Sequence, residues 1–493
     1  KGLNNLGVSF KKLALEYKTK VVGFYLGPIP SIVVDDPALI KEVLNTEQFD
    51  GRMDIILGRL RSYWKRLGIF FTDDYFWHVQ RRFSLRYMRD FGFGRRDGTL
   101  ETIVEQEVKE MIDMAVSGPK FPAEHELVKG DLINLPHFFA APFINGLLHV
   151  IGRMTLPRSE YHTLWTLARK GAIFQGGSND LGGALTITPW LKDIMPKWSG
   201  YKSLKEGNEG IRDLMTKLVN EAIQTFDDSH DRHFLDIYIR KMKEELKSNK
   251  RTTYSGNIYI ILLAVPCGFT PDQLVLICVD YAFPTATAVE NTLAFLAERI
   301  LLQPEIQDKI HEEIDRVVGR GRPPNLDDRK NMPYTESCIR EIMRYETLVP
   351  LGVPHRAMVD TTLGGYDIPE VRQNILCSCF IFIFLGSLVG VNYASLHHDK
   401  DIWGDPENFR PERFIVEGKL QVSRDKSLPF GAGRRLCAGE TYARQSMFQV
   451  FSAFMQAFHV STPDGAPLKK PFKRIQGIIV MLPNFWVRVK PRN

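Results

Sequence analysis

A single cysteine, Cys437, lies in a tight, glycine-punctuated loop within the stretch SLPFGAGRRLCAGETYARQ, residues 427–445. A thiolate is a strong, soft metal ligand and an electron donor. Gly431 and Gly433 allow the backbone to turn tightly beside a flat, bulky group, and Gly439 allows a following helix to approach whatever the sulfur binds. These residue types in this order predict a ligand-binding thiolate.

The charges around Cys437 favour the thiolate form. Arg434 and Arg435 raise the local positive potential, and the helix expected to begin near Ala438 directs its positive end at the sulfur. No second cysteine or histidine stands nearby, which argues against zinc and iron–sulfur sites. A ligand that fills its other coordination positions itself, such as haem, suits one cysteine. Spacing alone leaves a buried structural cysteine equally open.

Two further pairs have helical spacing. Trp77 and Arg81, in WHVQR, lie one helical turn apart and can face the same group. Glu341 and Arg344, in EIMR, lie at positions i and i+3 and can pair on one helix face. Taken singly, a core tryptophan, a surface cation or a solvated ion pair explains each of them as well.

Composition excludes several classes of protein. The chain has 493 residues, 44% hydrophobic and 25% charged, as expected for a soluble globular protein with a large core. A net charge of +6 gives no reason to expect nucleic acid binding, although it favours an anionic membrane surface or an acidic partner. The six cysteines show no disulfide framework, which indicates a reducing compartment.

Helical patterns dominate the elements that must position these residues. Residues 21–45 read as strand, turn, strand and helix, and short strands close the chain. Apolar residues at three- and four-residue spacing predict helices over residues 77–90, 100–116, 159–172, 205–226, 234–247, 271–300, 304–318, 333–346 and 439–458. We expect one mainly helical unit with a small strand-rich portion.

The segment FGAGRRLCAG, residues 430–439, resembles the haem-binding signature of the cytochrome P450 family at every fixed position. The resemblance covers nearly the whole chain. It implies a single catalytic domain, residues 1–493, with the mainly α haem-thiolate fold and a small β portion. It also implies that Cys437 is the proximal iron ligand of haem b, with Phe430, Gly431 and Gly439 at the haem.

The resemblance assigns roles to other motifs in order. In the family, residues at several fixed positions bind the haem propionates. The matching residues here are Trp77, Arg81, His355 in VPHR and Arg435, and Arg52 in FDGR matches more loosely. In the family a buried structural network holds the loop beside the haem, and its members here are Glu341, Arg344 and Arg413.

The activity implied by the resemblance is monooxygenation. One atom of dioxygen enters a lipophilic substrate, with electrons from NADPH through NADPH–cytochrome P450 reductase and in some members cytochrome b5. We expect apolar pocket walls from the stretch before Trp77, Phe283 with Thr287, Leu348–Val353, and IQGIIVML near the end of the chain. The segments GVPHR and NYASLHHD most resemble those of animal microsomal members, insect ones in particular. This resemblance implies that the protein is located at the cytosolic face of the endoplasmic reticulum membrane.

The central helix departs from the family pattern. The family relays protons to dioxygen through an acid followed by a threonine, but here Thr287 and Ala288 stand at those positions, and Pro284 and Thr285 replace the small residue and glycine before them. Thr285, Thr287 or Glu290 can serve as a substitute relay. The alternatives are a haem-thiolate isomerase or dehydratase that does not activate dioxygen, and a haem-binding protein without turnover.

Two other departures concern chain segments. Residues 371–390, VRQNILCSCFIFIFLGSLVG, form an apolar run where the family has only a short strand. A membrane span and a buried strand pair with a break at Gly386 are alternatives. We expect an insertion foreign to the working fold, such as a translated intron. Microsomal members begin with a membrane helix, and this sequence starts with KGLNNLGVSFKKLALEYKTK, which has neither signal-peptide nor membrane-span character. We therefore expect the anchor to be missing from it.

Overall fold

The computed structural model describes residues 6–27, 29–177, 183–252, 268–370, 372–377 and 380–492. Most of these residues are helical. The α-helices are α1 (Leu6–Glu16), α2 (Pro37–Asn45), α3 (Ile56–Arg61), α4 (Asp74–Arg89), α5 (Gly98–Val116), α6 (Ala140–Gly152), α7 (Tyr161–Gly176), α8 (Ala184–Ile187), α9 (Leu191–Ile194), α10 (Tyr201–Gln224), α11 (Phe234–Thr252), α13 (Pro271–Thr285), α14 (Ala288–Leu302), α15 (Glu305–Val317), α16 (Pro333–Glu346), α17 (Tyr393–His397), α18 (Lys400–Trp403) and α19 (Glu440–Ala457). Short 3-10 helices include η3 (His137–Phe139), η6 (Pro411–Phe414) and η8 (Gly433–Arg435).

Strands form small sheets. They are β1 (Val21–Leu26), β2 (Ile29–Val34), β3 (Gly51–Arg52), β4 (Val128–Lys129), β5 (Leu132–Leu135), β6 (His355–Arg356), β7 (Thr361–Leu363), β8 (Tyr366–Ile368), β9 (Arg372–Cys377), β10 (Phe380–Leu385), β11 (Leu388–Val391), β12 (Ile415–Val416), β13 (Lys419–Leu420), β14 (Phe458–Ser461) and β15 (Phe485–Pro491). The expected mainly α fold with a small β portion is therefore confirmed.

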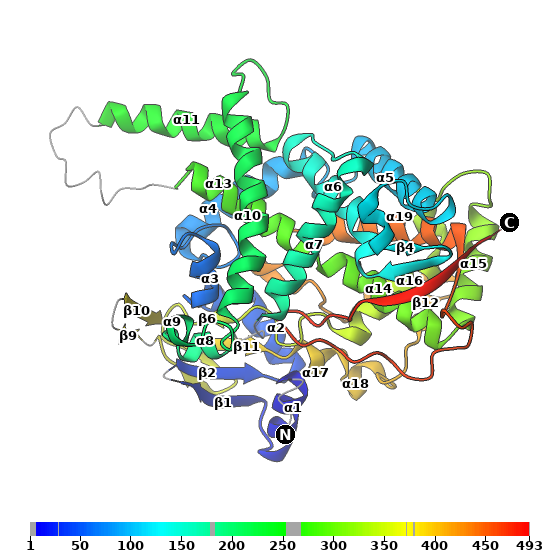
Figure 1. Cartoon of the computed structure of the whole chain (residues 1–493). Helices are drawn as coiled ribbons and strands as arrows, with labels where there is room; N and C mark the ends of the chain where they lie inside the picture. Colours follow the sequence, from blue (N-terminus) through cyan, green and yellow to red (C-terminus); the bar gives the residue numbers. More distant parts are fainter. Residues whose placement is uncertain are drawn as a thin grey trace.

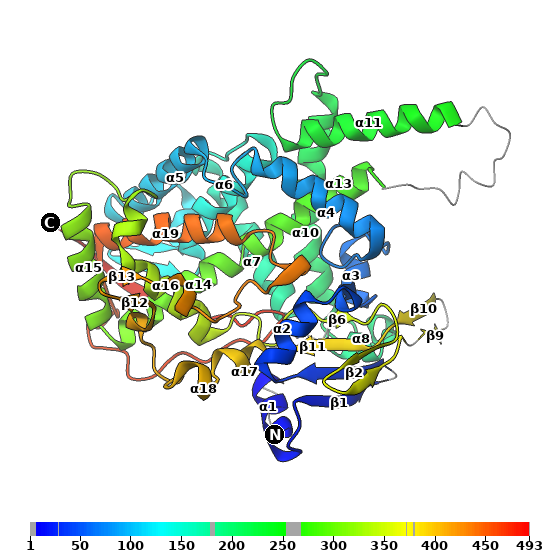
Figure 2. The same ribbon diagram turned by 180° about the vertical axis from the view of Figure 1, so that it is seen from behind.

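A group of packed helices and the largest sheet occupy opposite sides of the molecule. Helices α5, α6, α14, α15, α16 and α19 lie together on one side, whereas β1, β2 and β11 lie with α1 on the other (Figures 1 and 2). A large apolar cluster fills the helical side and includes buried side chains of α6, α13, α14 and α19. A second cluster, the α3 cluster, contains Ile56, Leu57, Leu60, Phe71, Phe174, Leu185, Phe283, Leu351 and Ile478.

The largest sheet has five strands in the order β1-β2-β11-β6-β3. Strand β11 runs parallel to β2 and antiparallel to β6. At its far edge, β3 pairs antiparallel with β6, which makes Arg52 and His355 direct partners. Directly opposite residues on neighbouring strands lie side by side, so the sheet brings together two residues that are distant in the sequence.

Most predicted helices form close to their expected bounds, but the predicted helix over 271–300 is broken. Helix α13 ends at Thr285 and α14 begins at Ala288. Pro284, inside the last turn of α13, has no backbone N–H to donate to the helical ladder, and α13 ends one residue after it. The hydroxyl of Thr285 donates to the Tyr281 carbonyl at 2.8 Å, and that of Thr287 donates to the Phe283 carbonyl at 3.2 Å.

The apolar run over residues 371–390 divides into two structural parts. Within the described part of the chain, strands β9 and β10 pair with each other alone, in an antiparallel register that joins Arg372 with Leu385. Strand β11 instead lies inside the five-stranded sheet, and its four residues are all buried. The hydroxyl of Ser387 donates to the Pro369 carbonyl at 2.8 Å, so the chain leaves and re-enters the fold at nearly the same point. The expected boundary at residue 390 therefore lies inside a core strand.

Candidate functional site

The loop that carries Cys437 is held in a closed turn. The backbone N–H of Cys437 donates to the Phe430 carbonyl at 2.8 Å, directly before α19. Gly433 has a φ of +66°, and a side chain there would collide with the carbonyl of Leu44 on α2. Glycine is the residue that adopts this conformation without strain, so Gly433 fixes the path of the loop. Phe430 and Gly431 lie in the same turn, and Gly439 lies just after it, directly before α19.

The electrostatics of the Cys437 thiol differ from those expected. The side chain is exposed to solvent, yet protein surrounds it closely enough that burial raises the pKa of the thiol. A hydrogen bond from the Gly439 backbone and the charge of Arg81 oppose that shift. Arg434 instead pairs with Glu47 and Asp50, both at 2.8 Å. The expectation that Arg434 and Arg435 stabilise the thiolate was therefore wrong, because Arg81 is the cation that acts on the sulfur.

A cluster of cations, the cationic cradle, lies beside this loop. It consists of Arg52, Arg81 and Arg435 together with the neutral ring of His355, whose pKa is lowered by burial and by the charge of Arg52. Arg81 and Arg435 lie against the indole of Trp77. The guanidinium of Arg435 lies 3.6 Å from the centre of the Trp77 ring, and that of Arg81 lies 5.8 Å away. Arg81 also donates to the carbonyl of Leu436, which neighbours Cys437. The structure thus brings together all five residues for which the resemblance implies a role at the propionates.

Three buried polar atoms of the cradle have no hydrogen-bond partner. Trp77 Nε1 and both Nε and Nη1 of Arg52 are buried and form no hydrogen bond. Burial and the charge of Arg52 lower the pKa of Arg435 to about 8, and burial lowers that of Arg52 to about 10. Buried donors without partners and mutually repelling cations are costly, and an anionic group relieves both. The two carboxylates of haem fit this donor set.

The predicted structural network is present and buried. Arg344 donates to both carboxylate oxygens of Glu341, at 2.7 and 2.8 Å, and Arg413 Nε donates to Oε1 at 2.9 Å. The remaining guanidinium donors of the two arginines reach backbone carbonyls, including those of His397 and Trp403. Every charged group is therefore compensated, as a buried ion cluster requires.

His397 extends this network to the cysteine loop, a link that sequence reasoning missed. Burial lowers the pKa of His397 to about 3, so the ring is neutral. Its Nδ1 donates to the Thr347 hydroxyl at 2.9 Å, and its Nε2 accepts the backbone N–H of Leu428 at 2.9 Å. Leu428 lies two residues before Phe430, so α16 is connected to the loop through hydrogen bonds. No motif in the sequence points to this histidine.

The three candidate relay residues do not converge. Thr287 accepts a hydrogen bond from Gln175 Nε2 on α7 at 3.5 Å. Glu290 is fully buried and contacts His137 Nδ1 on η3 at 3.1 Å, and burial raises its pKa. Thr285 donates to its own helix. None of these contacts joins Thr285, Thr287 or Glu290 to the cationic cradle.

The α3 cluster brings together all four stretches expected to line a substrate pocket. Ile56, Leu57 and Leu60 come from the stretch before Trp77, and Phe71 follows them. Phe283 comes from α13, Leu351 from the segment after α16, and Ile478 from IQGIIVML. These side chains are apolar, as contacts with a lipophilic substrate require.

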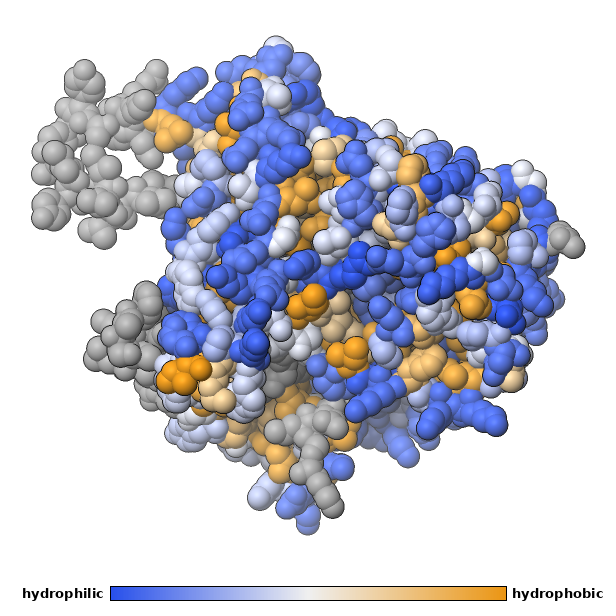
Figure 3. Space-filling view, viewed as in Figure 1, coloured by the Kyte–Doolittle hydropathy of each residue, from blue (hydrophilic) through white to orange (hydrophobic). Residues whose placement is uncertain are grey.

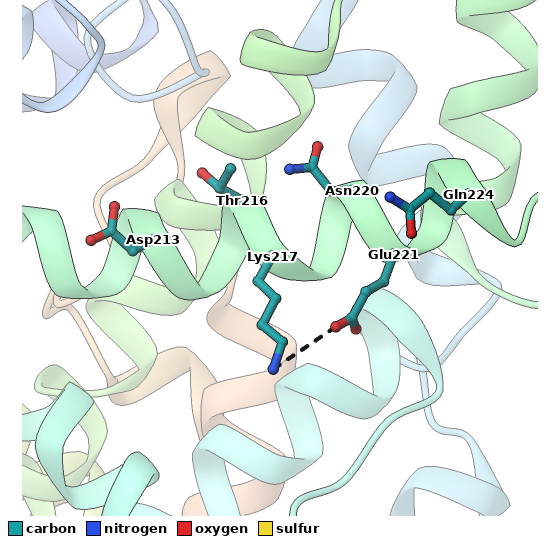
Figure 4. A pocket seen from close by; sticks show the side chains of 6 residues that line it. All are labelled: Asp213, Thr216, Lys217, Asn220, Glu221 and Gln224. Atoms are coloured by element: carbon teal, nitrogen blue, oxygen red, sulfur yellow. Dashed lines mark ion pairs between the residues drawn. The ribbon is translucent and has the colours of Figure 1, made fainter.

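A separate groove lies on the surface of α10 and has a different character. Its walls are the polar side chains of Asp213, Thr216, Lys217, Asn220, Glu221 and Gln224, all from one helix, with Lys217 and Glu221 forming an ion pair (Figure 4). It contains none of the residues of the cradle, the Cys437 loop or the α3 cluster. We assign no chemistry to it.

Comparison with known proteins matches residues 2–264 and 282–486 to the family described as Cytochrome P450. The chain belongs to the cytochrome P450 family. Similar proteins include farnesoate epoxidase of Bombyx mori, 28% identical over 474 residues, which cover 96% of this chain and 86% of that protein. Cytochrome P450 2U1 of Homo sapiens is 28% identical, covering 92% of this chain and 75% of the relative. Probable cytochrome P450 305a1 of Drosophila melanogaster is 26% identical, covering 93% and 84%.

Family membership confirms the resemblance to animal P450 enzymes, including insect ones. The protein is a P450 monooxygenase, an oxidoreductase with a haem cofactor, and such enzymes use redox partners and lipophilic substrates. The microsomal relatives fit an association with the endoplasmic reticulum membrane. No helix in the described part of the chain has both the length and the apolar character needed to cross a bilayer.

Proposed function

We propose that this protein inserts one oxygen atom from dioxygen into a lipophilic substrate of the isoprenoid type, using electrons from NADPH. The cationic cradle beside Cys437 is the observation that carries the proposal, because its unpartnered donors fit the carboxylates of haem. The similarity to a farnesoate epoxidase supports the isoprenoid class. Bound haem supplies the oxygen-activating chemistry, with Cys437 as the iron ligand that favours cleavage of the oxygen–oxygen bond.

The residues of the chain have separate tasks in this proposal. Arg52, Arg81, His355, Arg435 and Trp77 hold the two carboxylates. Glu341, Arg344 and Arg413 keep the Cys437 loop in place through His397. The α3 cluster receives the apolar substrate and excludes water. Thr285, Thr287 and Glu290 remain the candidates for moving protons.

We propose NADPH–cytochrome P450 reductase as the electron donor, with cytochrome b5 as a second donor. Helix α4 supports this, because it carries Trp77 and Arg81 next to the Cys437 loop. The same helix exposes Arg82, Arg86 and Arg89 to solvent. Exposed cations beside the cofactor steer an acidic partner to the place where electrons must enter.

We propose that the protein works at the cytosolic face of the endoplasmic reticulum membrane. An apolar surface supports this proposal and is visible at the lower left of Figure 3. It is formed by helices α8 and α9 and the residues after them. Its exposed members are Ile187, Trp190, Ile194, Met195 and Trp198. Exposed apolar side chains gathered in one region indicate contact with a membrane or a partner.

A second candidate function rests on the break between α13 and α14. The hydroxyl protons of Thr285 and Thr287 are both used on helix carbonyls, and Glu290 pairs with His137. A site without a free acid–hydroxyl pair suits an isomerase or dehydratase that does not activate dioxygen, or a haem protein without turnover.

The deciding experiment uses the haem-loaded full chain. The carbon-monoxide difference spectrum of the reduced protein reports thiolate ligation, and oxygen consumption with NADPH and reductase reports dioxygen activation. We expect the thiolate band and substrate-dependent oxygen consumption, and we expect Cys437→Ser to lose the band whereas Cys278→Ala retains it. A normal band without oxygen consumption would instead establish the second candidate.

A further inference from the structure

Arg61, the last residue of α3, is a buried cation with an unused donor. Its side chain is only 6% exposed, and its Nη2 donates to Asp280 Oδ1 on α13. Its Nη1 is buried and has no hydrogen-bond partner. A buried guanidinium N–H without an acceptor costs free energy, so its position demands an explanation.

The position of Arg61 is fixed from the other side by Asp280. The second carboxylate oxygen of Asp280 accepts the backbone N–H groups of Ile69 and Phe70, at 2.5 and 3.1 Å. Gly68 has a φ of +85°, and a side chain there would collide with this carboxylate. Asp280 therefore has its acceptors filled, and Arg61 keeps the free donor.

The free donor stands at the edge of the apolar α3 cluster. Leu57 and Leu60 on the same helix belong to that cluster, and the Arg61 guanidinium lies 5.4 Å from the centre of the Phe71 ring, another member. On α13, Phe283 follows Asp280 by three residues, so both lie on one helix face. The free donor of Arg61 therefore lies beside the α3 cluster, which contains residues from all four stretches predicted to line the pocket.

We propose that Arg61 anchors the carboxylate end of an isoprenoid acid, whose hydrocarbon chain packs in the α3 cluster. This inference rests on the proposed function and makes its substrate class specific. The Arg61–Asp280 pair is neutral overall, and Nη1 of Arg61 has no acceptor. A carboxylate oxygen of the substrate accepts the hydrogen bond from this donor. Arg61 is then a specificity-determining residue that sets which end of the substrate points away from the reacting carbons.

The test measures binding rather than turnover. Farnesoic acid and methyl farnesoate are titrated into the haem-loaded full chain, with dissociation constants from calorimetry and from the shift in haem absorbance. We expect the parent protein to prefer the acid. Arg61→Gln should weaken binding of the acid at least tenfold, as for a hydrogen bond between charged groups, and change binding of the ester less than threefold.

Two further variants keep the test decisive. Arg61→Gln combined with Asp280→Asn removes both charges of the pair. No unpaired carboxylate is then left buried, to unfold the protein or to repel the acid. We expect the double variant to lose affinity for the acid as the single variant does. Arg59→Gln is the matched control, since Arg59 lies on α3 but pairs with the partly exposed Asp54, and it should bind both probes normally. The carbon-monoxide spectrum verifies folding of each variant.

Several outcomes would overturn the anchor. Equal affinity of the parent for acid and ester would mean that Nη1 meets water only. Equal loss for both probes in the double variant would make Arg61 a structural residue. Binding of neither probe, with a normal carbon-monoxide band, would reject the isoprenoid acid and the anchor together. Selective acid binding without oxygen consumption would leave the anchor standing and reject monooxygenation alone.

Discussion

At the scale of single residues, the cationic cradle places like charges within reach of one another in a buried space. Arg52, Arg81 and Arg435 each have a pKa lowered chiefly by burial. Such a group is unfavourable by itself and becomes favourable with carboxylates between its members. Apoprotein stability and cofactor retention should therefore respond in opposite directions to the same substitution.

Arg52→Gln tests this opposition. Removing the buried charge relieves repulsion, so we expect the apoprotein to unfold at a higher urea concentration, by about 1 kcal/mol. The same variant should release haem several-fold faster to a scavenging protein, because a propionate partner is gone. Arg59→Gln, on the nearby helix α3, should change neither quantity. Loss of apoprotein stability in Arg52→Gln would contradict the argument.

Glu107 gives the protein a pH-dependent stability outside the site. Burial raises the pKa of this carboxyl to about 7, and the Tyr161 hydroxyl donates to it at 2.5 Å. The folded state therefore holds the proton more tightly than the unfolded chain, whose pKa is near 4.5. This stabilisation is complete below the unfolded pKa and is lost as the pH rises through the folded pKa.

We expect the free energy of unfolding to fall by about 1–3 kcal/mol between pH 5.5 and pH 8 from this group. Glu107→Gln should remove that part of the slope, measured as urea midpoints at pH 5.5, 7 and 8. Glu105→Gln, on the exposed face of the same helix, is the control. Parallel slopes for Glu107→Gln and the parent would refute the assignment.

At the scale of elements, the hairpin formed by β9 and β10 separates from the rest of the fold. Among the residues that the structure describes, its strands pair with no other strand, and Pro369 and Ser387 meet at its base. Strand β11, by contrast, is a central strand. We therefore propose that the foreign insertion is the hairpin, residues 371–385, and that residues 386–390 belong to the working fold.

Two deletions distinguish these boundaries. Removal of residues 371–385 should leave the carbon-monoxide thiolate band and the unfolding midpoint unchanged or improved. Removal of residues 371–390 should abolish folding, because it takes most of β11 from between β2 and β6. Equal behaviour of the two deletions would refute the boundary at residue 386, and sequencing the mature transcript tests the intron origin.

Local patterns predicted some elements well and others not at all. Helices with one apolar face, such as α5 and α16, form close to their predicted bounds. Helix α6 was missed because almost all of its residues are buried, so no polar face marks a period. Sequence motifs identified Arg52 and His355 as site residues, but their pairing depends on the register between strands that are distant in the sequence. The role of His397 depends on contacts with Thr347 and Leu428, which no sequence motif indicates.

At the scale of the whole molecule, the Glu341 network connects the helical side to the cysteine loop. Glu341→Gln should strand two buried arginines and lower the free energy of unfolding by about 3–5 kcal/mol. Haem retention should fall with it, because His397 and Leu428 lose their anchor. The matched control is Glu412→Gln, which breaks an exposed pair with Lys309 and should cost less than about 1 kcal/mol. Urea midpoints and haem content of both variants provide the comparison.

The register between β3 and β6 has a consequence for where the chain tolerates changes in length. Because neighbouring side chains of a strand point to opposite faces, a single residue inserted beside Arg52 or His355 would turn one of them away from its partner. The hairpin of β9 and β10 enters after β8 and leaves before β11, so it adds residues without disturbing that alignment. A library of one-residue insertions should therefore show a narrow intolerant window at β3 and β6, set by side-chain parity rather than by burial.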